Sequence, residues 1–209
     1  MVQVRAEHPV NQDGTVDIDA WIERIRQRVP LPEPQLLKRA CEWAAELDRA
    51  SSQTEHRWAN GASSYRTGLE MAEILADLKL DQESLVAAVI YRAVREHKTG
   101  LEEVRRNLGD EVAGLVDGVQ RMAAISISHN PSRAKAFNAQ SQVENLRKML
   151  VTMIDDVRVV LIKLAERTCA IRAVKDAPEE KRYRVAREVF DIYAPLAHRL
   201  GIGHIKWEL

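Results

Sequence analysis

Apolar side chains recur at intervals of three and four residues along most of the chain, and no segment alternates apolar and polar residues as a half-buried strand does. The helical spacing is clearest in residues 33–49, 65–80, 82–96, 110–125, 141–153 and 176–193. Two polar stretches interrupt it, and the second, residues 126–140, is typical of a mobile loop. The pattern therefore predicts one all-α domain, a bundle of about ten helices.

Residues 157–174, VRVVLIKLAERTCAIRAV, differ from the other segments because they are apolar almost all the way round a helix. Such a helix is normally buried on every side. Lys163, Glu166 and Arg167 nevertheless lie within it at positions i, i+3 and i+4, and so share one face. Because an unpaired charge in a core is very costly, this face is either a seam of paired charges or the wall of a cavity that once carried out chemistry.

A second set of charges lies at the polar end of residues 82–96, whose middle, LVAAVIY, is apolar on all sides. Arg92, Arg95 and Glu96 again stand at i, i+3 and i+4 and share a face. A solvated last turn of a helix is the plain interpretation of this set, and a functional face is the alternative.

The composition argues against several classes of protein. With 31 basic and 31 acidic residues the formal net charge is zero, which argues against gripping nucleic acid or an anionic membrane by bulk charge. Cys41 and Cys169 both lie in helical patterns, as expected of buried thiols in a reducing compartment. The first residues lack the apolar core of a signal peptide, and no apolar run is long enough to span a membrane. We therefore expect a cytoplasmic protein.

Four motifs resemble the N-terminal part of the long RelA/SpoT proteins, which make and break the alarmone (p)ppGpp. They are VLIKLAERTCAIRAVKDAP, IYAPLAHRLGIGHIKWEL, ILADLKLD and VDGVQRM, and the resemblance runs from about Trp58 to Leu209. It implies an all-α HD-type (p)ppGpp hydrolase domain, which a nucleotidyl-transfer-like synthetase domain and regulatory domains follow in the family.

The expected domain organisation follows from this resemblance. Residues 1–17 are polar and predicted to be loosely ordered, and residues 18–200 are predicted to form the hydrolase-like domain. Pro195 and Gly201 are expected to bracket a short piece, and residues 201–209 to begin a linker helix toward a synthetase domain. The apolar face of Ile205, Trp207 and Leu209 is cut short, which indicates a fragment of a longer protein.

The family's hydrolases hold a manganese ion, and the chain departs from their ligand pattern at each ligand. Thr67-Gly68 stands where the family has His-Pro, and Tyr91-Arg92 where it has His-Asp. Glu166 replaces the late Asp. Threonine and tyrosine are poor ligands for a hard divalent ion, and a guanidinium has no lone pair to give.

The surroundings of the family's metal site differ as well. Arg95-Glu96 stands where the family has the Glu-Asp pair that helps to activate water, Cys169-Ala170 where it has His-Asn, and Trp58-Ala59 where it has an Arg-Lys pair that contacts the nucleotide. Of this surround only Arg172 is retained. The six histidines are scattered without ligand spacing. We therefore expect no metal and no cofactor.

The pattern of loss resembles the synthetase-dedicated branch of the family. It implies a catalytically inactive, hydrolase-like domain with a structural or regulatory role in a GTP pyrophosphokinase of the stringent response. The implied partners are the synthetase domain of the same chain and, through further domains, the ribosome; neither a membrane nor DNA is expected.

Three alternatives remain open at this point. The first is a pocket that still binds (p)ppGpp or another guanine nucleotide as an allosteric sensor, with Arg92, Arg95 and Arg172 taking phosphates. The second is a divergent but active phosphohydrolase. The third is a plain helical docking module for the ribosome or for another copy of the chain.

One further expectation concerns what replaced the metal. An arginine at the Asp position and an acid on the facing helix can form a pair with parallel hydrogen bonds. We therefore expect Arg92 or Arg95 to pair with Glu166 or Glu96.

Overall fold

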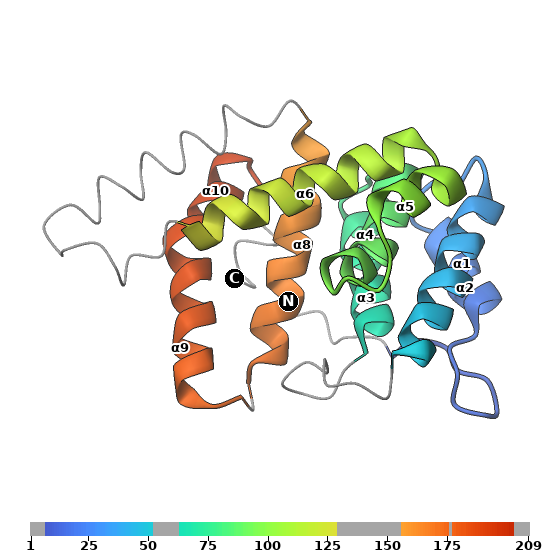
Figure 1. Cartoon of the computed structure of the whole chain (residues 1–209), viewed down its shortest axis with the longest axis horizontal. Coiled ribbons are helices and arrows are strands. Elements are labelled where there is room, and N and C mark those ends of the chain that lie inside the picture. Colours follow the sequence, from blue (N-terminus) through green and yellow to red (C-terminus); the bar gives the residue numbers. More distant parts are fainter. Residues whose placement is uncertain (1–6, 52–62, 129–155, 176, 203–209) are drawn as a thin grey trace, which may run out of the picture.

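The computed structural model describes residues 7–51, 63–128, 156–175 and 177–202, and these residues form an all-α bundle (Figure 1). The elements are α1 (Ile18–Arg26), α2 (Pro34–Ala50), α3 (Ser64–Asp77), α4 (Gln82–Arg95), α5 (Leu101–Leu108), α6 (Asp110–Ser128), α8 (Val157–Ala173), α9 (Glu179–Glu188), the π-helical turn η2 (Val189–Tyr193) and α10 (Ala194–Arg199). The only β feature in the described part of the chain is a single antiparallel bridge between Val10 and Val16. The predicted all-α class is confirmed.

Side-chain caps fix where several helices begin. The carboxylates of Asp17, Asp81 and Asp156 accept backbone N–H groups at the starts of α1, α4 and α8, and the hydroxyl of Ser63 does so for α3. Such caps satisfy backbone donors that have no partner within the helix.

Helix α4 is the centre of the bundle, because α2, α3, α6 and α8 all pack against it (Figure 1). All the side chains from Gln82 to Val94 except that of Glu83 are buried, as its all-round apolar middle predicts. The crossing of α3 with α4 is close at Gly68, where an added Cβ would lie 2.6 Å from the carbonyl oxygen of Val89. Glycine at this position therefore sets how near the two backbones lie.

Helix α8 is buried on the side of α3, α4 and α6, and α9 packs on its other side. A small apolar cluster separate from the main core joins α8 to α9; it consists of Ala170, Val174, Ala177, Val185 and Val189. The outer face of α9 and η2 leaves Tyr183 and Phe190 exposed. Helix α9 thus packs on α8 through a small apolar cluster, whereas η2 and α10 contribute Ile192, Tyr193, Leu196 and Ala197 to the main core.

The C-terminal helices correct one expectation. Pro195 does not open a separate piece, since α9, η2 and α10 follow one another without a break. Proline lacks an N–H, and its ring clashes with the carbonyl four residues earlier in a regular α-helix. Here the backbone widens into a π-turn just before it, and the N–H of Ala194 bonds to the carbonyl of Val189, five residues back. The wider turn lets the helix continue through the proline.

The N-terminal segment also differs from its expectation over the residues described, 7–17. The carboxylate of Asp13 accepts the backbone N–H and the hydroxyl of Thr15, and Val16 is buried. Arg24 donates to the carbonyl of Glu7 at 3.0 Å. Aspartate and threonine close such turns through their side chains, a signal that apolar periodicity does not register.

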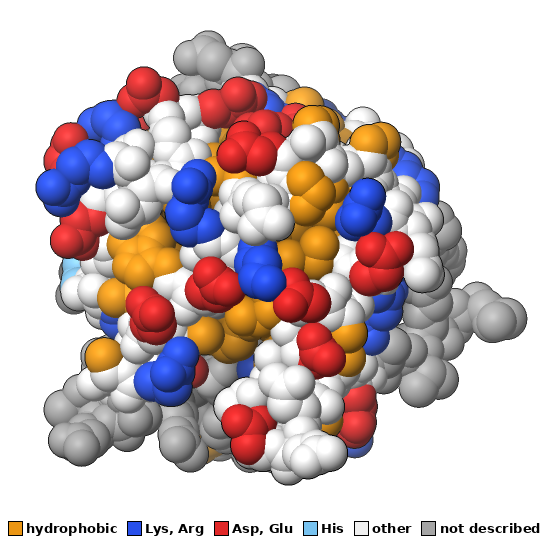
Figure 2. All heavy atoms as spheres, turned by 90° about the vertical axis from the view of Figure 1, so that its right-hand side faces the viewer, with side chains coloured by type: hydrophobic (Ala, Val, Ile, Leu, Met, Phe, Trp, Pro, Cys, Tyr) orange, Lys and Arg blue, Asp and Glu red, His pale blue; other side chains and the backbone are white. Residues whose placement is uncertain are grey.

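The predicted loop at residues 126–140 begins later than expected, because α6 continues to Ser128. The rest of that loop and the helix expected at residues 141–153 lie outside the described residues, as does the linker helix expected near residue 203. No helix within the described residues is both long and apolar enough to cross a membrane. On the face seen in Figure 2, basic and acidic side chains are interspersed, in keeping with the zero net charge.

Candidate functional site

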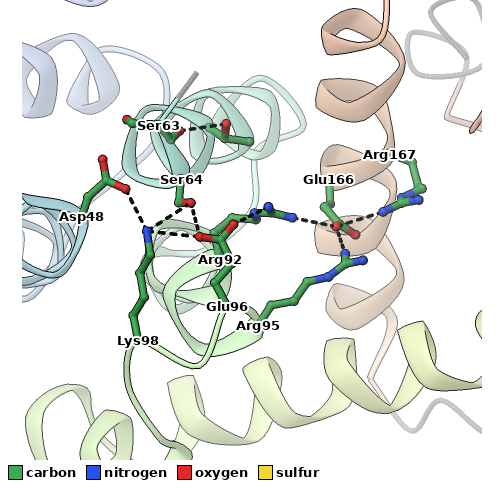
Figure 3. Close-up of polar contacts among 10 residues, drawn as sticks. Asp48, Ser63, Ser64, Arg92, Arg95, Glu96, Lys98, Glu166 and Arg167 are labelled. Atoms are coloured by element: carbon green, nitrogen blue, oxygen red, sulfur yellow. Dashed lines mark hydrogen bonds and ion pairs between the residues drawn. The ribbon is translucent and has the colours of Figure 1, made fainter. Parts of the chain in front are cut away.

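The carboxylate of Glu166 is the centre of a buried cluster of charges between α4 and α8 (Figure 3). Its side chain is 0% exposed, and four cations surround it. Arg95 donates to Oε1, where Arg92 lies 3.5 Å and Arg167 3.0 Å away. The Nζ of Lys163 lies 2.5 Å from Oε2. The charged face of α8 is therefore a seam of paired charges, one of the two interpretations of the sequence.

The local structure explains why these groups meet. Lys163 and Glu166 are one turn apart on α8 and so lie on the same face. Arg92 and Arg95 occupy the last turn of α4, where cations are stabilised by the helix dipole. Since α4 and α8 pack together, this turn lies against Glu166. The expected pairing of Arg92 or Arg95 with Glu166 or Glu96 is confirmed.

Glu166 is ionised in this setting. Burial would raise the pKa of its carboxyl, but the charges of Arg167, Lys163, Arg95 and Arg92 outweigh it and hold the pKa well below its ordinary value. A carboxylate in this state is a poor proton acceptor. Its role is to compensate the cations around it.

Lys163 is the least securely charged of the four cations. Burial lowers the pKa of its amine to about 7, although Glu166 opposes that shift, and the neighbouring Arg167 and Arg95 lower it further. Arginine keeps its charge in the same environment, because its pKa is far higher. The charge of Lys163 therefore changes near neutral pH.

A second carboxylate, Glu96, extends the cluster toward α2 and α3. It lies 2.5 Å from Nη2 of Arg92 and 3.1 Å from Nζ of Lys98, and it accepts the hydroxyl of Ser64. Lys98 also pairs with Asp48 of α2, at 3.0 Å. Burial would raise the pKa of Glu96, but the hydroxyl of Ser64, Arg92 and Lys98 together lower it. The solvated-turn interpretation is wrong for Arg92 and Glu96, whose side chains are only 10% and 9% exposed, whereas Arg95 is 32% exposed.

The cluster also reaches α9. Arg167 donates to Glu188 at 3.0 Å, and its guanidinium lies 5.9 Å from the ring centre of Tyr193. Both distances are within the range of an attractive interaction. Arg167 therefore connects the central carboxylate with the C-terminal helices.

The other predicted site residues lie partly apart from this cluster. Tyr91 is fully buried beside Glu166 and Arg95, and burial raises the pKa of its phenol, so the ring stays neutral. The hydroxyl of Thr67 donates to the carbonyl of Ser63 in its own helix. Arg172 pairs with Glu70 at 2.8 Å, in an ion pair that joins α8 to α3. Trp58 and Ala59 lie outside the described residues.

Sequence reasoning did not find Asp48, Ser64, Lys98 or Glu188 as members of the site. Asp48 and Lys98 are 50 positions apart, and Ser64 and Glu96 are 32 apart. No local spacing connects residues at such separations. A polar run after the buried helix α4, Arg95 to Thr99, was the one available signal.

The residues present do not fit the manganese ion that the resemblance implies. A hard divalent ion needs several oxygen or imidazole donors that converge with open lone pairs. Here guanidinium and ammonium groups take the lone pairs of Glu166. Within the described ranges, no three histidine, cysteine, aspartate or glutamate side chains are grouped so that they could hold a metal ion. Thr67 and Tyr91 offer only hydroxyls, which are neutral donors.

Comparison with known proteins identifies the class to which this bundle belongs. The HD domain family matches residues 40–203, and the chain is a member of it. Over its whole length it is 38% identical to the GTP pyrophosphokinases of Photobacterium angustum and Escherichia coli K12. It is also 36% identical, over 86% of its length, to the bifunctional (p)ppGpp synthase/hydrolase SpoT of Escherichia coli. The resemblance to the RelA/SpoT proteins is therefore confirmed.

The relatives are much longer proteins. The matches cover 100% of this chain but only 26% of the Photobacterium protein and 27% of the Escherichia coli one. The chain thus spans about a quarter of the length of the curated relatives that it matches.

Proposed function

We propose that this chain is a hydrolase-like domain that does not hydrolyse (p)ppGpp and that has a structural and regulatory role in a longer alarmone synthetase. The observation that supports the proposal most strongly is the pairing of Glu166 with Arg92 and Arg95. Two cationic side chains fixed on α4 supply the positive charge that a metal-dependent hydrolase takes from its ion. They hold the helices together but cannot bind and activate water as a metal does.

The cluster also lacks a group suited to proton abstraction. An effective general base has a pKa near the working pH and lone pairs that reach the reacting water. Glu166 and Glu96 both have lowered pKa values and accept from several cations or hydroxyls. Lys163 has a suitable pKa of about 7, but it is fully buried against Glu166. The arrangement supports cross-linking of helices rather than hydrolysis.

For the longer protein we propose the activity of the relatives named GTP pyrophosphokinase, the transfer of pyrophosphate from ATP to the 3′ hydroxyl of GTP or GDP. The residues for that reaction belong to a synthetase domain outside this chain. The hydrolase-like domain would contact the synthetase domain in the same polypeptide, and the ribosome would be reached through further domains. The cytoplasm is the compartment in which these partners occur.

The alternative of an allosteric nucleotide pocket receives little support from the geometry. Each arginine that would take a phosphate already holds a carboxylate: Arg92 and Arg95 hold Glu166, and Arg172 holds Glu70. A phosphate would have to displace a buried carboxylate that then loses its compensating charge, which is costly. The same pairs argue against a divergent active phosphohydrolase.

One experiment tests the proposal. Purified protein is incubated with ppGpp and excess manganese chloride, and pyrophosphate release is followed, with the Escherichia coli SpoT protein as the positive control. We expect release no faster than in a sample without protein, and no heat of binding when ppGpp is titrated in a calorimeter. Pyrophosphate release above that background would overturn the proposal, and binding without hydrolysis would favour the nucleotide pocket.

A further inference from the structure

The ion pairs of the cluster form one uninterrupted chain across the domain. From α2 to α9 the charges alternate in sign through Asp48, Lys98, Glu96, Arg92, Glu166, Arg167 and Glu188. Each consecutive pair lies within 3.5 Å, and Figure 3 shows the members from Asp48 to Arg167. The five inner side chains are at most 11% exposed, whereas the two ends, Asp48 and Glu188, are 23% and 27% exposed. The ion-pair chain therefore has little contact with water along its length and reaches water at both ends.

The charges in this ion-pair chain and its side branches do not balance, because cations are in excess. With the side branches Arg95 and Lys163 the cluster has five basic and four acidic side chains. Glu166 is shared among four of the cations, and Arg92 is shared between Glu96 and Glu166. In a dry interior, where charges interact strongly, a change in one shared pair alters the neighbouring pair.

We propose that this ion-pair chain couples the two ends of the domain, so that the state of Glu188 on α9 changes the strength with which Lys98 is held at Asp48 on α2. The direction follows from the sharing. When Glu188 is lost, Arg167 keeps its pair with Glu166 and competes more strongly with Arg92 for that carboxylate. Arg92 then turns to Glu96, which loosens the hold of Glu96 on Lys98. Lys98 in turn depends more on Asp48.

The arrangement of the helices gives this coupling a use. α9 itself packs on α8 through a small apolar cluster, and its ion pair with Arg167 adds to that contact. A partner or domain that moves α9 would alter the Arg167–Glu188 pair, and the chain would carry the change to the opposite side of the bundle. The inference holds whether or not the domain hydrolyses (p)ppGpp, because it concerns only pairs within the fold.

A double-mutant cycle on unfolding tests the coupling. Urea unfolding is measured for the unmodified chain, Asp48→Asn, Glu188→Gln and the double variant. Both residues are partly exposed, so each single variant is expected to fold. We expect the unfolding equilibrium constant of the double variant to be at least about threefold larger than the product of the two single effects predicts. The excess arises because Asp48 matters more when Glu188 is absent.

Asp19 supplies the matched control, because it pairs with Lys38 at an exposed site that is not part of the ion-pair chain. The effects of Asp19→Asn and Glu188→Gln on the unfolding equilibrium constant are expected to multiply to within about twofold, as those of independent sites do. Arg92→Met breaks the ion-pair chain at its middle and, when added to these variants, is expected to remove the extra destabilisation of the double variant. Effects of Asp48→Asn and Glu188→Gln that multiply like those of the control pair would overturn the proposal.

A measurement on the folded protein gives a second test in case Arg92→Met does not fold. In the ¹³C NMR spectrum of Glu188→Gln, the side-chain carboxyl resonance of Asp48 is expected to shift. Glu23→Gln, at an exposed pair on α1, is expected to leave it in place. An unchanged Asp48 resonance in folded Glu188→Gln would also overturn the proposal.

Discussion

Arg95 on α4 donates to the carboxylate of Glu166 on α8, and this pair spans two helices whose residues are 71 positions apart in the chain. Glu166 is fully buried, so its charge depends on that contact and on the three other cations around it. Breaking a buried pair from one side leaves an uncompensated charge. Substitutions in this pair are therefore expected to change the free energy of unfolding strongly.

Replacing Glu166 by alanine should strongly destabilise the fold, because it leaves four cations, three of them buried, without their shared anion. We expect a loss of about 3–5 kcal/mol in the free energy of unfolding. Arg95→Ala should cost less, since Arg95 is about one third exposed, and Arg92→Ala should fall between the two. Urea unfolding followed by circular dichroism measures these changes.

The matched control for this series is Lys38→Ala, which breaks an exposed pair with Asp19 and should cost about 0–1 kcal/mol. In the double variant Arg95→Ala with Glu166→Ala, the loss should be smaller than the sum of the single losses, because both remove the same contact. A Glu166→Ala loss no larger than that of Lys38→Ala would show that the cluster is solvated.

Lys163 should make stability rise with pH above neutrality. Burial lowers the pKa of its amine in the folded protein to about 7, while in the unfolded chain it keeps the ordinary value of about 10.4. Between these values the unfolded state binds more protons than the folded state, so stability increases as pH rises. The raised pKa of Cys41 acts in the opposite direction above about pH 8.5, and that of Tyr91 does so above about pH 10.

Lys163→Met tests this pH dependence. The variant removes the titrating amine and keeps most of the side-chain volume, so the slope of stability between pH 7 and about pH 8.5 should flatten. Because the cluster has an excess of cations, the variant should be at least as stable as the unmodified chain at pH 6. Parallel stability curves for the two proteins over this window would refute a role for Lys163.

Gly68 and Gly114 should respond to alanine in opposite directions. A Cβ at Gly68 would lie 2.6 Å from the backbone carbonyl of Val89, so Gly68→Ala must force α3 and α4 apart. Overpacking of this kind typically costs about 1–3 kcal/mol. Gly114 lies within α6 with open space around it, and alanine there should add up to about 1 kcal/mol of stability through its higher helix propensity. Thermal unfolding of the two variants compares them directly; equal shifts would argue against the close crossing.

The sequence could indicate the helices and half of the site, for identifiable reasons. Apolar periodicity is a local signal, and the helices that it predicts are found in the structure. The pairing of Arg92 or Arg95 with Glu166 could be expected because the resemblance placed their two helices against each other. Asp48, Lys98 and Glu188 could not be found in this way, because their pairing depends on how distant helices pack.

The local departures have physical causes that periodicity does not record. The turn at Asp13 and Thr15 rests on side-chain hydrogen bonds to the backbone. The continuation of the C-terminal helices through Pro195 rests on a π-turn, and apolar spacing alone gave no sign of it. In both places a specific backbone geometry satisfies groups that a regular helix or an unstructured tail would leave unpaired.

The central claim is that the charges of α4 occupy the place in which related hydrolases would need a metal, so that Glu166 is a junction of ion pairs rather than a metal ligand. Thermal unfolding of the purified chain in excess manganese chloride, compared with unfolding in a chelator, tests it most directly, because an ion that binds the folded state raises the melting temperature. We expect identical melting temperatures under the two conditions, in the unmodified chain and in Arg95→Ala. A rise of several degrees with manganese that disappears in Glu166→Gln would contradict the account.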